Sequence, residues 1–107
     1  MSATLHPRAG CRASVRGVVQ GVGFRPFVHR LALRYHVDGW VRNASGEVAL
    51  GLEGDMEELR AFLAALRQEA PPLARIESVT VAWTEPTGLT GFVIEVSDEQ
   101  PGARLPV

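Results

Sequence analysis

Residues 12–35, RASVRGVVQGVGFRPFVHRLALRY, contain the change of hydrophobic period that decides the fold. Over residues 12–19 apolar and polar side chains alternate, which predicts a half-buried strand. Gly21 and Gly23 then predict a tight turn. Beyond this turn the apolar side chains recur every three or four positions, which predicts an amphipathic helix. These apolar positions are Phe24, Phe27, Val28, Leu31, Ala32 and Tyr35.

The segments on the C-terminal side continue this alternation of strands and helices. Strands are expected at residues 38–43, 47–53 and 75–84, with a shorter one at 91–97, and a second helix between a cap at Asp55 and the stop at Ala70-Pro71-Pro72. The order strand, helix, strand, strand, helix, strand is the ferredoxin-like βαββαβ plan. We therefore predict an α+β fold with two helices packed on one face of an antiparallel sheet.

The length of 107 residues is enough for one domain and too little for two. We expect a flexible lead-in over residues 1–10, the domain over 11–97 and a polar, proline-containing tail over 98–107. No apolar run approaches the roughly 20 residues of a membrane span, and the start of the chain lacks the apolar stretch of a signal peptide. The single cysteine, Cys11, excludes an internal disulfide. A cytoplasmic protein without a membrane partner is expected.

The charge is small overall and uneven along the chain. Residues 1–37 contain six arginines and no acid, and residues 38–107 carry five arginines and twelve acids, so the two parts have net charges of +6 and −7. The chain has no lysine, and a guanidinium forms forked hydrogen bonds with phosphate or carboxylate. The alternative explanation for the absence of lysine is a GC-rich genome, which encodes arginine in its place without any role in anion binding. The net charge of −1 argues against nonspecific nucleic-acid binding.

The junction between the first strand and the first helix is the candidate anion site. The first backbone N–H groups of a helix are unpaired and carry a partial positive charge, so a glycine-bearing loop that enters a helix favours an anion. Arg25 opposes the helix dipole there, and no Ser, Thr, Asp or Asn stands in the loop as a cap. A bound anion would satisfy the guanidinium and the N–H groups together. A purely structural turn and an exposed arginine are the alternatives, and the spacing of Gly21 and Gly23 matches no nucleotide motif.

Asn43 is the second candidate, because it ends the strand that follows the first helix and can face the loop. Its alternative is a turn residue that opens the sequence Asn43-Ala44-Ser45-Gly46. His29 and His36 are expected at the surface. No cluster of His, Asp or Glu has the spacing of a metal site, and no Ser or Cys has an evident base. We therefore expect neither a metal nor another cofactor in this chain.

Two motifs resemble the acylphosphatase family. Val19-Gln20-Gly21-Val22-Gly23-Phe24-Arg25 is similar to the signature V-Q-G-V-x-F-R, and Gly39-Trp40-Val41-Arg42-Asn43 is similar to the second block, G-W-V-x-N. The resemblance covers roughly residues 11–97 and implies the ferredoxin-like fold. It also implies a phosphate cradle formed by Gln20, Gly21, Val22, Gly23, Phe24 and Arg25. In this cradle Arg25 would bind the phosphoryl oxygens, and Asn43 would position the attacking water.

Finer features resemble one branch of that family, the N-terminal domain of the hydrogenase-maturation carbamoyltransferases (HypF type). These features are Phe24-Arg25-Pro26-Phe27-Val28 and Pro71-Pro72-Leu73-Ala74-Arg75-Ile76-Glu77, together with a tail that resembles a linker toward further domains. The branch implies hydrolysis of carbamoyl phosphate as the first step of carbamoyl transfer, with downstream domains and a hydrogenase-maturation protein as partners. The alternatives are a stand-alone acylphosphatase of broad specificity and a non-catalytic module that binds phosphate or docks partner domains.

Overall fold

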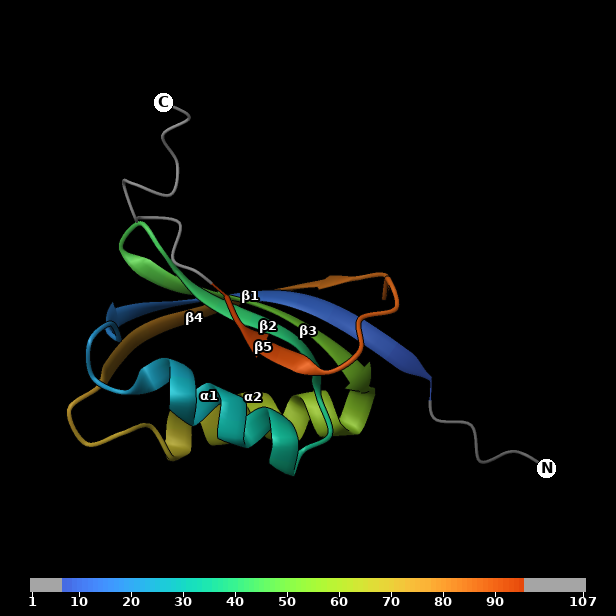
Figure 1. Ribbon diagram of the computed structural model, residues 1–107, viewed down its shortest axis with the longest axis horizontal. Helices are drawn as coiled ribbons and strands as arrows, with labels where there is room; N and C mark the ends of the chain where they lie inside the picture. The colour runs from blue at the N-terminus through green and yellow to red at the C-terminus, as the bar shows by residue number, and fades with distance from the viewer. Residues whose placement is uncertain (1–6, 96–107) are drawn as a thin grey trace.

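The computed structural model describes residues 7–95 as one sheet with two helices packed against it (Figure 1). The helices lie side by side on the same face of the sheet, as the periodicity predicts. The elements in chain order are β1 (Arg8–Val18), α1 (Phe24–Arg34), β2 (Asp38–Ala44), β3 (Glu47–Asp55), α2 (Met56–Gln68), β4 (Arg75–Thr84) and β5 (Phe92–Ile94). This arrangement confirms the predicted ferredoxin-like α+β fold.

The sheet has the strand order β4-β1-β3-β2-β5 and is mixed, so the prediction of a wholly antiparallel sheet is wrong in one respect. The four long strands pair antiparallel with their neighbours, whereas β5 pairs parallel with β2. The directions of the strands explain this difference. Since each antiparallel pairing reverses the direction, β4 runs opposite to β2. A chain that turns back after β4 therefore runs in the same direction as β2 when it reaches that edge.

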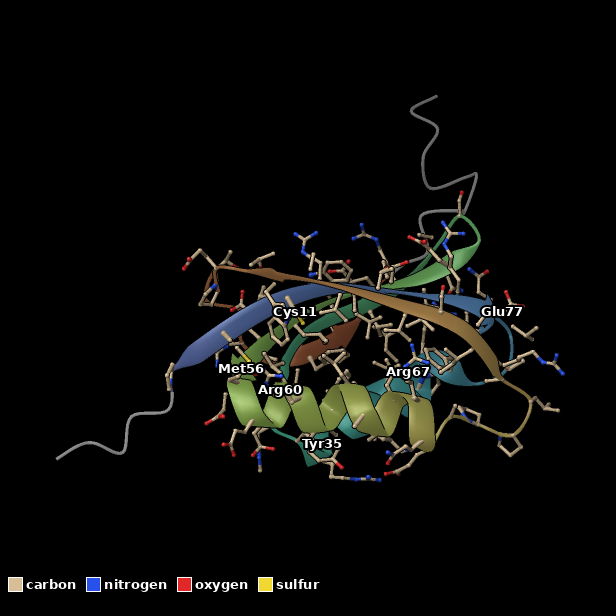
Figure 2. All side chains as sticks on the ribbon, turned by 180° about the vertical axis from the view of Figure 1, so that it is seen from behind. Cys11, Tyr35, Met56, Arg60, Arg67 and Glu77 are labelled. Carbon is tan, nitrogen blue, oxygen red and sulfur yellow. The ribbon has the colours of Figure 1, made fainter. Side chains whose placement is uncertain are left out.

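The core lies between the sheet and the helices. On β1 the odd-numbered residues Cys11, Ala13 and Val15 face the helices and are buried, while Arg12 and Arg16 are exposed on the open face. This alternation is what a strand with one covered face requires. Figure 2 shows Cys11 on the side of the sheet that faces the helices. The largest fully buried side chains come from all layers and include Phe24, Leu31, Leu50, Leu52, Leu59, Phe62 and Leu66.

Two predicted boundaries differ from the observed ones. The first strand begins at Arg8 rather than residue 12, so the expected lead-in over residues 1–10 is too long. Composition could not find this start, because residues 8–10 are held by pairing with β3, whose partners lie more than 40 positions away. Among the described residues of the predicted last strand 91–97, Phe92–Ile94 form β5, and residues 91 and 95 lie outside it. Residues 1–6 and 96–107, which include the predicted tail, lie outside the described residues.

The segment from residue 85 to 91 crosses one end of the sheet and is held there by a buried carboxylate. Glu53 of β3 is only 4% exposed. It accepts hydrogen bonds from the backbone N–H and hydroxyl of Thr87 and from the backbone N–H groups of Gly88 and Leu89, at 2.6–3.0 Å. Burial raises the pKa of the Glu53 carboxyl, but these hydrogen bonds outweigh the burial and lower it to about 2. This crossing carries the chain from β4 to the edge where β5 pairs.

Candidate active site

The loop between β1 and α1 (residues 19–23) enters the helix without a capping side chain. Gly23 occupies the N-cap position with a φ of 81°, and Gly21 has a φ of 74°. Both conformations favour glycine because a Cβ is strained there. Within the part of the chain that the structure describes, no hydrogen bond is donated by the backbone N–H groups of residues 21–25. The helix N-terminus therefore offers several donors to an anion, as the sequence predicts.

Arg25 lies in the first turn of α1 and is half-buried. Its guanidinium forms neither a hydrogen bond nor an ion pair with any other residue in the range 7–95. Three other arginines of the N-terminal segment are neutralised: Arg8 pairs with Asp38, Arg16 with Glu47 and Arg34 with Glu69, at 2.9–3.1 Å. Ion pairs thus cancel three of the six positive charges of that segment, and the Arg25 charge remains at the helix N-terminus.

Asn43 lies in β2 and not in the turn that follows. It pairs with Val48, and the turn consists of Ser45 and Gly46, so a role as the opening turn residue does not describe it. Asn43 is two positions beyond Val41, which faces the helices and is fully buried, so alternation places the Asn43 side chain on the same face as α1. Its side-chain oxygen is buried. The carboxamide oxygen is therefore shielded from bulk solvent at this end of the sheet.

Gln20 joins the two candidate elements. Its side-chain Nε2 donates to the carbonyl oxygens of Ala44 and Glu47, at 3.0 and 2.9 Å, which are the two residues that close the β2–β3 turn. The loop that carries the free N–H groups is thereby fixed against the end of β2 that carries Asn43. The resemblance to the acylphosphatase signature grouped Gln20 with the phosphate-binding residues, but its side-chain amide donates to these two carbonyl oxygens. That resemblance was the only basis for predicting a role in phosphate binding.

Some side chains of the predicted cradle pack in the core, and another is accessible to a ligand. Phe24 is fully buried in the core, and Val22 packs against the core. Gly21 and Gly23 contribute backbone only. Arg25 is therefore the one member of the predicted cradle, residues 20–25, whose side chain is left for a ligand. Recognition at this loop would rest on the Arg25 guanidinium and on backbone N–H groups.

Other chemistry finds little support among the described residues. Over residues 7–95 no group of three or more His, Cys, Asp or Glu side chains could hold a metal ion. Burial raises the pKa of the Cys11 thiol to about 11, which keeps it a neutral thiol at neutral pH. Neither described helix is long and apolar enough to cross a membrane. The donors gathered at the start of α1 are the principal chemical feature.

The two-layer fold with the sheet order described above defines a ferredoxin-like α+β domain. The acylphosphatase family model matches residues 11–94, which is most of the chain. The chain belongs to the acylphosphatase family, and this membership indicates a hydrolase.

The relatives are of two kinds. The chain is 44% identical over 88 residues to an acylphosphatase of Thermococcus kodakarensis, a match that covers 81% of this chain and 96% of that protein. It is 50% identical over 68 residues to the carbamoyltransferase HypF2 of Cupriavidus necator, covering 64% of this chain but 8% of that protein. The structure of full-length HypF in the phosphate- and nucleotide-bound form superposes with a TM-score of 0.85 at 29% identity, over 92% of this chain and 13% of that one. The chain thus spans about a tenth of the length of the HypF proteins it matches.

Proposed function

We propose that this domain hydrolyses acyl phosphates at the N-terminus of α1, with Arg25 and Asn43 as the catalytic residues. The observation that carries the proposal is the Arg25 guanidinium, which lies without a protein partner in the range 7–95 beside unpaired backbone N–H groups. Guanidinium and backbone N–H donors are the groups that stabilise the charge of a phosphoryl group during its transfer.

The mechanism needs two functions from the protein. An acyl phosphate is a mixed anhydride with a good leaving group, so neither a covalent nucleophile nor a metal is required. Arg25 and the N–H groups of the β1–α1 loop would hold and neutralise the phosphoryl oxygens. The Asn43 carboxamide would orient a water molecule in line with the bond that breaks. An amide suits this position because a carboxylate would repel the phosphate dianion.

A metal-independent reaction without a cofactor follows from this mechanism. We expect hydrolysis of acetyl phosphate to continue unchanged in an excess of EDTA. Loss of activity in EDTA and its recovery with a divalent ion would contradict the mechanism. The measurement is phosphate release by the 107-residue chain. Binding of phosphate with no hydrolysis of any acyl phosphate would instead support a non-catalytic phosphate-binding or docking module.

For the physiological substrate we propose carbamoyl phosphate, hydrolysed as the first step of carbamoyl transfer during hydrogenase maturation in the cytoplasm. The support is the similarity to HypF carbamoyltransferases, of which this chain matches only a small part. Further domains of the same protein and a hydrogenase-maturation protein would then be its partners. The alternative, a stand-alone enzyme with broad specificity, is supported by the matches to acylphosphatases over 96% and 91% of their length. Carbamoyl transfer by a parent protein that carries Arg25→Gln distinguishes the two, because transfer at the unaltered rate would exclude this domain as the entry point.

A further inference from the structure

The outer edge of β4 is a long strand edge without a partner strand among the described residues. β4 is first in the strand order, so within residues 7–95 only β1 pairs with it. β5, at the other edge of the sheet, has three residues, whereas β4 has ten. The edge of β4 therefore presents a row of backbone donors and acceptors to which another strand can be added.

The middle of β4 lacks the features that keep other chains away from an edge strand. Charged residues, prolines and bulges commonly provide this protection. Residues 78–84 have the sequence SVTVAWT, which contains no charge, no proline and no glycine. Their register with β1 is regular throughout. Residues 78–84 are thus a regular, uncharged strand that is open on one side.

Two large apolar side chains remain exposed along this edge. Val81 is in register with Ala13 of β1, on the face of the sheet that carries the helices. Trp83 is in register with Cys11 on the same face. Both partners on β1 are buried, whereas Val81 and Trp83 are 37% and 45% exposed. An added strand beside β4 would remove part of this apolar surface from water.

Opposite charges flank β4. Arg75 begins the strand, Glu85 follows its last residue, and both are exposed. Neither side chain forms an ion pair with another residue in the range 7–95. Arg75 and Glu85 are each five positions from Thr80. If two copies of β4 pair antiparallel about Thr80, Arg75 of each copy therefore meets Glu85 of the other.

The remaining cross-strand neighbours fit the same register. Thr80 lies opposite Thr80 of the second copy, and Val81 lies opposite its Val79. Pairs of β-branched residues and pairs of opposite charge both stabilise a sheet, and long side chains reach across a local irregularity such as the shift between Ser78 and Ile76. Centring the pairing on Val81 would instead place Glu77 opposite Glu85 of the second copy. Like charges directly opposite are destabilising, so the charges select Thr80 as the centre.

We infer that β4 is a homodimerisation surface, at which two copies of this chain pair their β4 strands antiparallel about Thr80 into one continuous sheet. A two-fold interface uses the same edge of both copies and therefore closes at a dimer. The edges that remain free are those of β5, which is only three residues long. The inference does not depend on the proposed hydrolysis.

Sedimentation velocity of the 107-residue chain tests the inference over protein concentrations from about 1 μM to about 1 mM. We expect an equilibrium between monomer and dimer. Thr80→Lys should abolish the dimer, because two like charges then lie directly opposite each other. Thr84→Lys, on the same face at the end of the strand, should weaken the dimer much less. A chain that stays monomeric throughout, or that forms open-ended assemblies, would overturn the inference.

Charge reversal tests the register. Arg75→Glu and Glu85→Arg should each raise the Kd of the dimer about tenfold, because each places like charges opposite each other at both ends. The double variant Arg75→Glu/Glu85→Arg should restore the Kd of the unaltered chain. Arg30→Glu, the same change of charge on α1, is the matched control and should leave the Kd unchanged. Urea unfolding of each variant checks that the fold is retained. Single variants that dimerise as the unaltered chain does, or a double variant that does not recover, would contradict the pairing about Thr80.

Discussion

Gln20 donates a hydrogen bond of 3.0 Å to the carbonyl oxygen of Ala44, the residue that follows Asn43 in β2. The same Nε2 donates a second hydrogen bond to the carbonyl oxygen of Glu47, so Gln20 connects the β1–α1 loop to the β2–β3 turn. Each connected segment is close in sequence to one candidate catalytic residue. Arg25 is five positions after Gln20, and Asn43 is one before Ala44. Gln20 thus fixes the β1–α1 loop, which carries the proposed phosphate-binding groups, relative to Asn43, the proposed water-binding residue.

Gln20→Ala should therefore lower activity without removing any group of the proposed chemistry. Both hydrogen bonds are lost, and the loop is free to shift relative to Asn43. A misplacement of about 1 Å is enough to reduce catalysis by about 10²-fold. We expect kcat for acetyl phosphate to fall more than the affinity for inorganic phosphate, which depends on the loop and Arg25 alone. Equal loss of both would place Gln20 among the phosphate ligands.

Arg25→Gln should abolish most of the affinity for phosphate and leave the fold intact, because the half-buried guanidinium has no partner among residues 7–95. Inorganic phosphate should raise the Tm of the unaltered chain by mass action and leave the Tm of the variant almost unchanged. The control is Arg30→Gln, an exposed arginine later in the same helix that likewise lacks an ion pair in the described range. Phosphate that stabilised the Arg25 and Arg30 variants equally would refute the assignment.

Asn43→Ala should lower kcat by about 10²-fold or more while KM changes little, since orientation of the water matters chiefly in the transition state. Steady-state kinetics with acetyl phosphate provides the measurement. Ser45→Ala serves as the control, because Ser45 is an exposed residue of the neighbouring turn. Retention of the unaltered kcat in the Asn43 variant would show that the carboxamide has no catalytic role.

Glu53 lies at the end of the sheet away from the candidate site, and its lowered pKa predicts that the stability of the fold depends on pH. Burial alone would raise its pKa, but the hydrogen bonds from residues 87–89 lower it to about 2 from the ordinary 4.5. A carboxyl with a lowered pKa stabilises the folded state above its ordinary pKa, and this stabilisation is lost as the pH falls from about 4.5 toward 2.

Glu53→Gln should remove part of this dependence and destabilise the protein at pH 7 by about 2–4 kcal/mol, because an amide nitrogen cannot accept hydrogen bonds from the buried N–H groups. Urea unfolding at pH 7 and at pH 3 measures both effects. Glu85→Gln, a change at an exposed carboxylate next to the same segment, should have little effect on either. A Glu53 variant as stable as the unaltered chain at pH 7 would contradict the role of this carboxylate.

The site illustrates how far sequence reasoning reaches. The free N–H groups at the start of α1 could be predicted, because glycines and an absence of caps act within one turn of chain. Asn43 could be predicted as a candidate site residue, but its location could not, since the sequence around it fits a turn as well as a strand. Pairing with Val48 of β3 decided in favour of the strand.

By itself the sequence determined the α+β class, the order of the long elements and the residues of the loop, because hydrophobic period and turn chemistry are local properties of the chain. Only the tertiary structure decided that β5 runs parallel to β2 and that Gln20 binds the β2–β3 turn. These relationships join residues that are 24 to 53 positions apart. No local pattern records such a pairing, since it follows from the direction in which each strand enters the sheet.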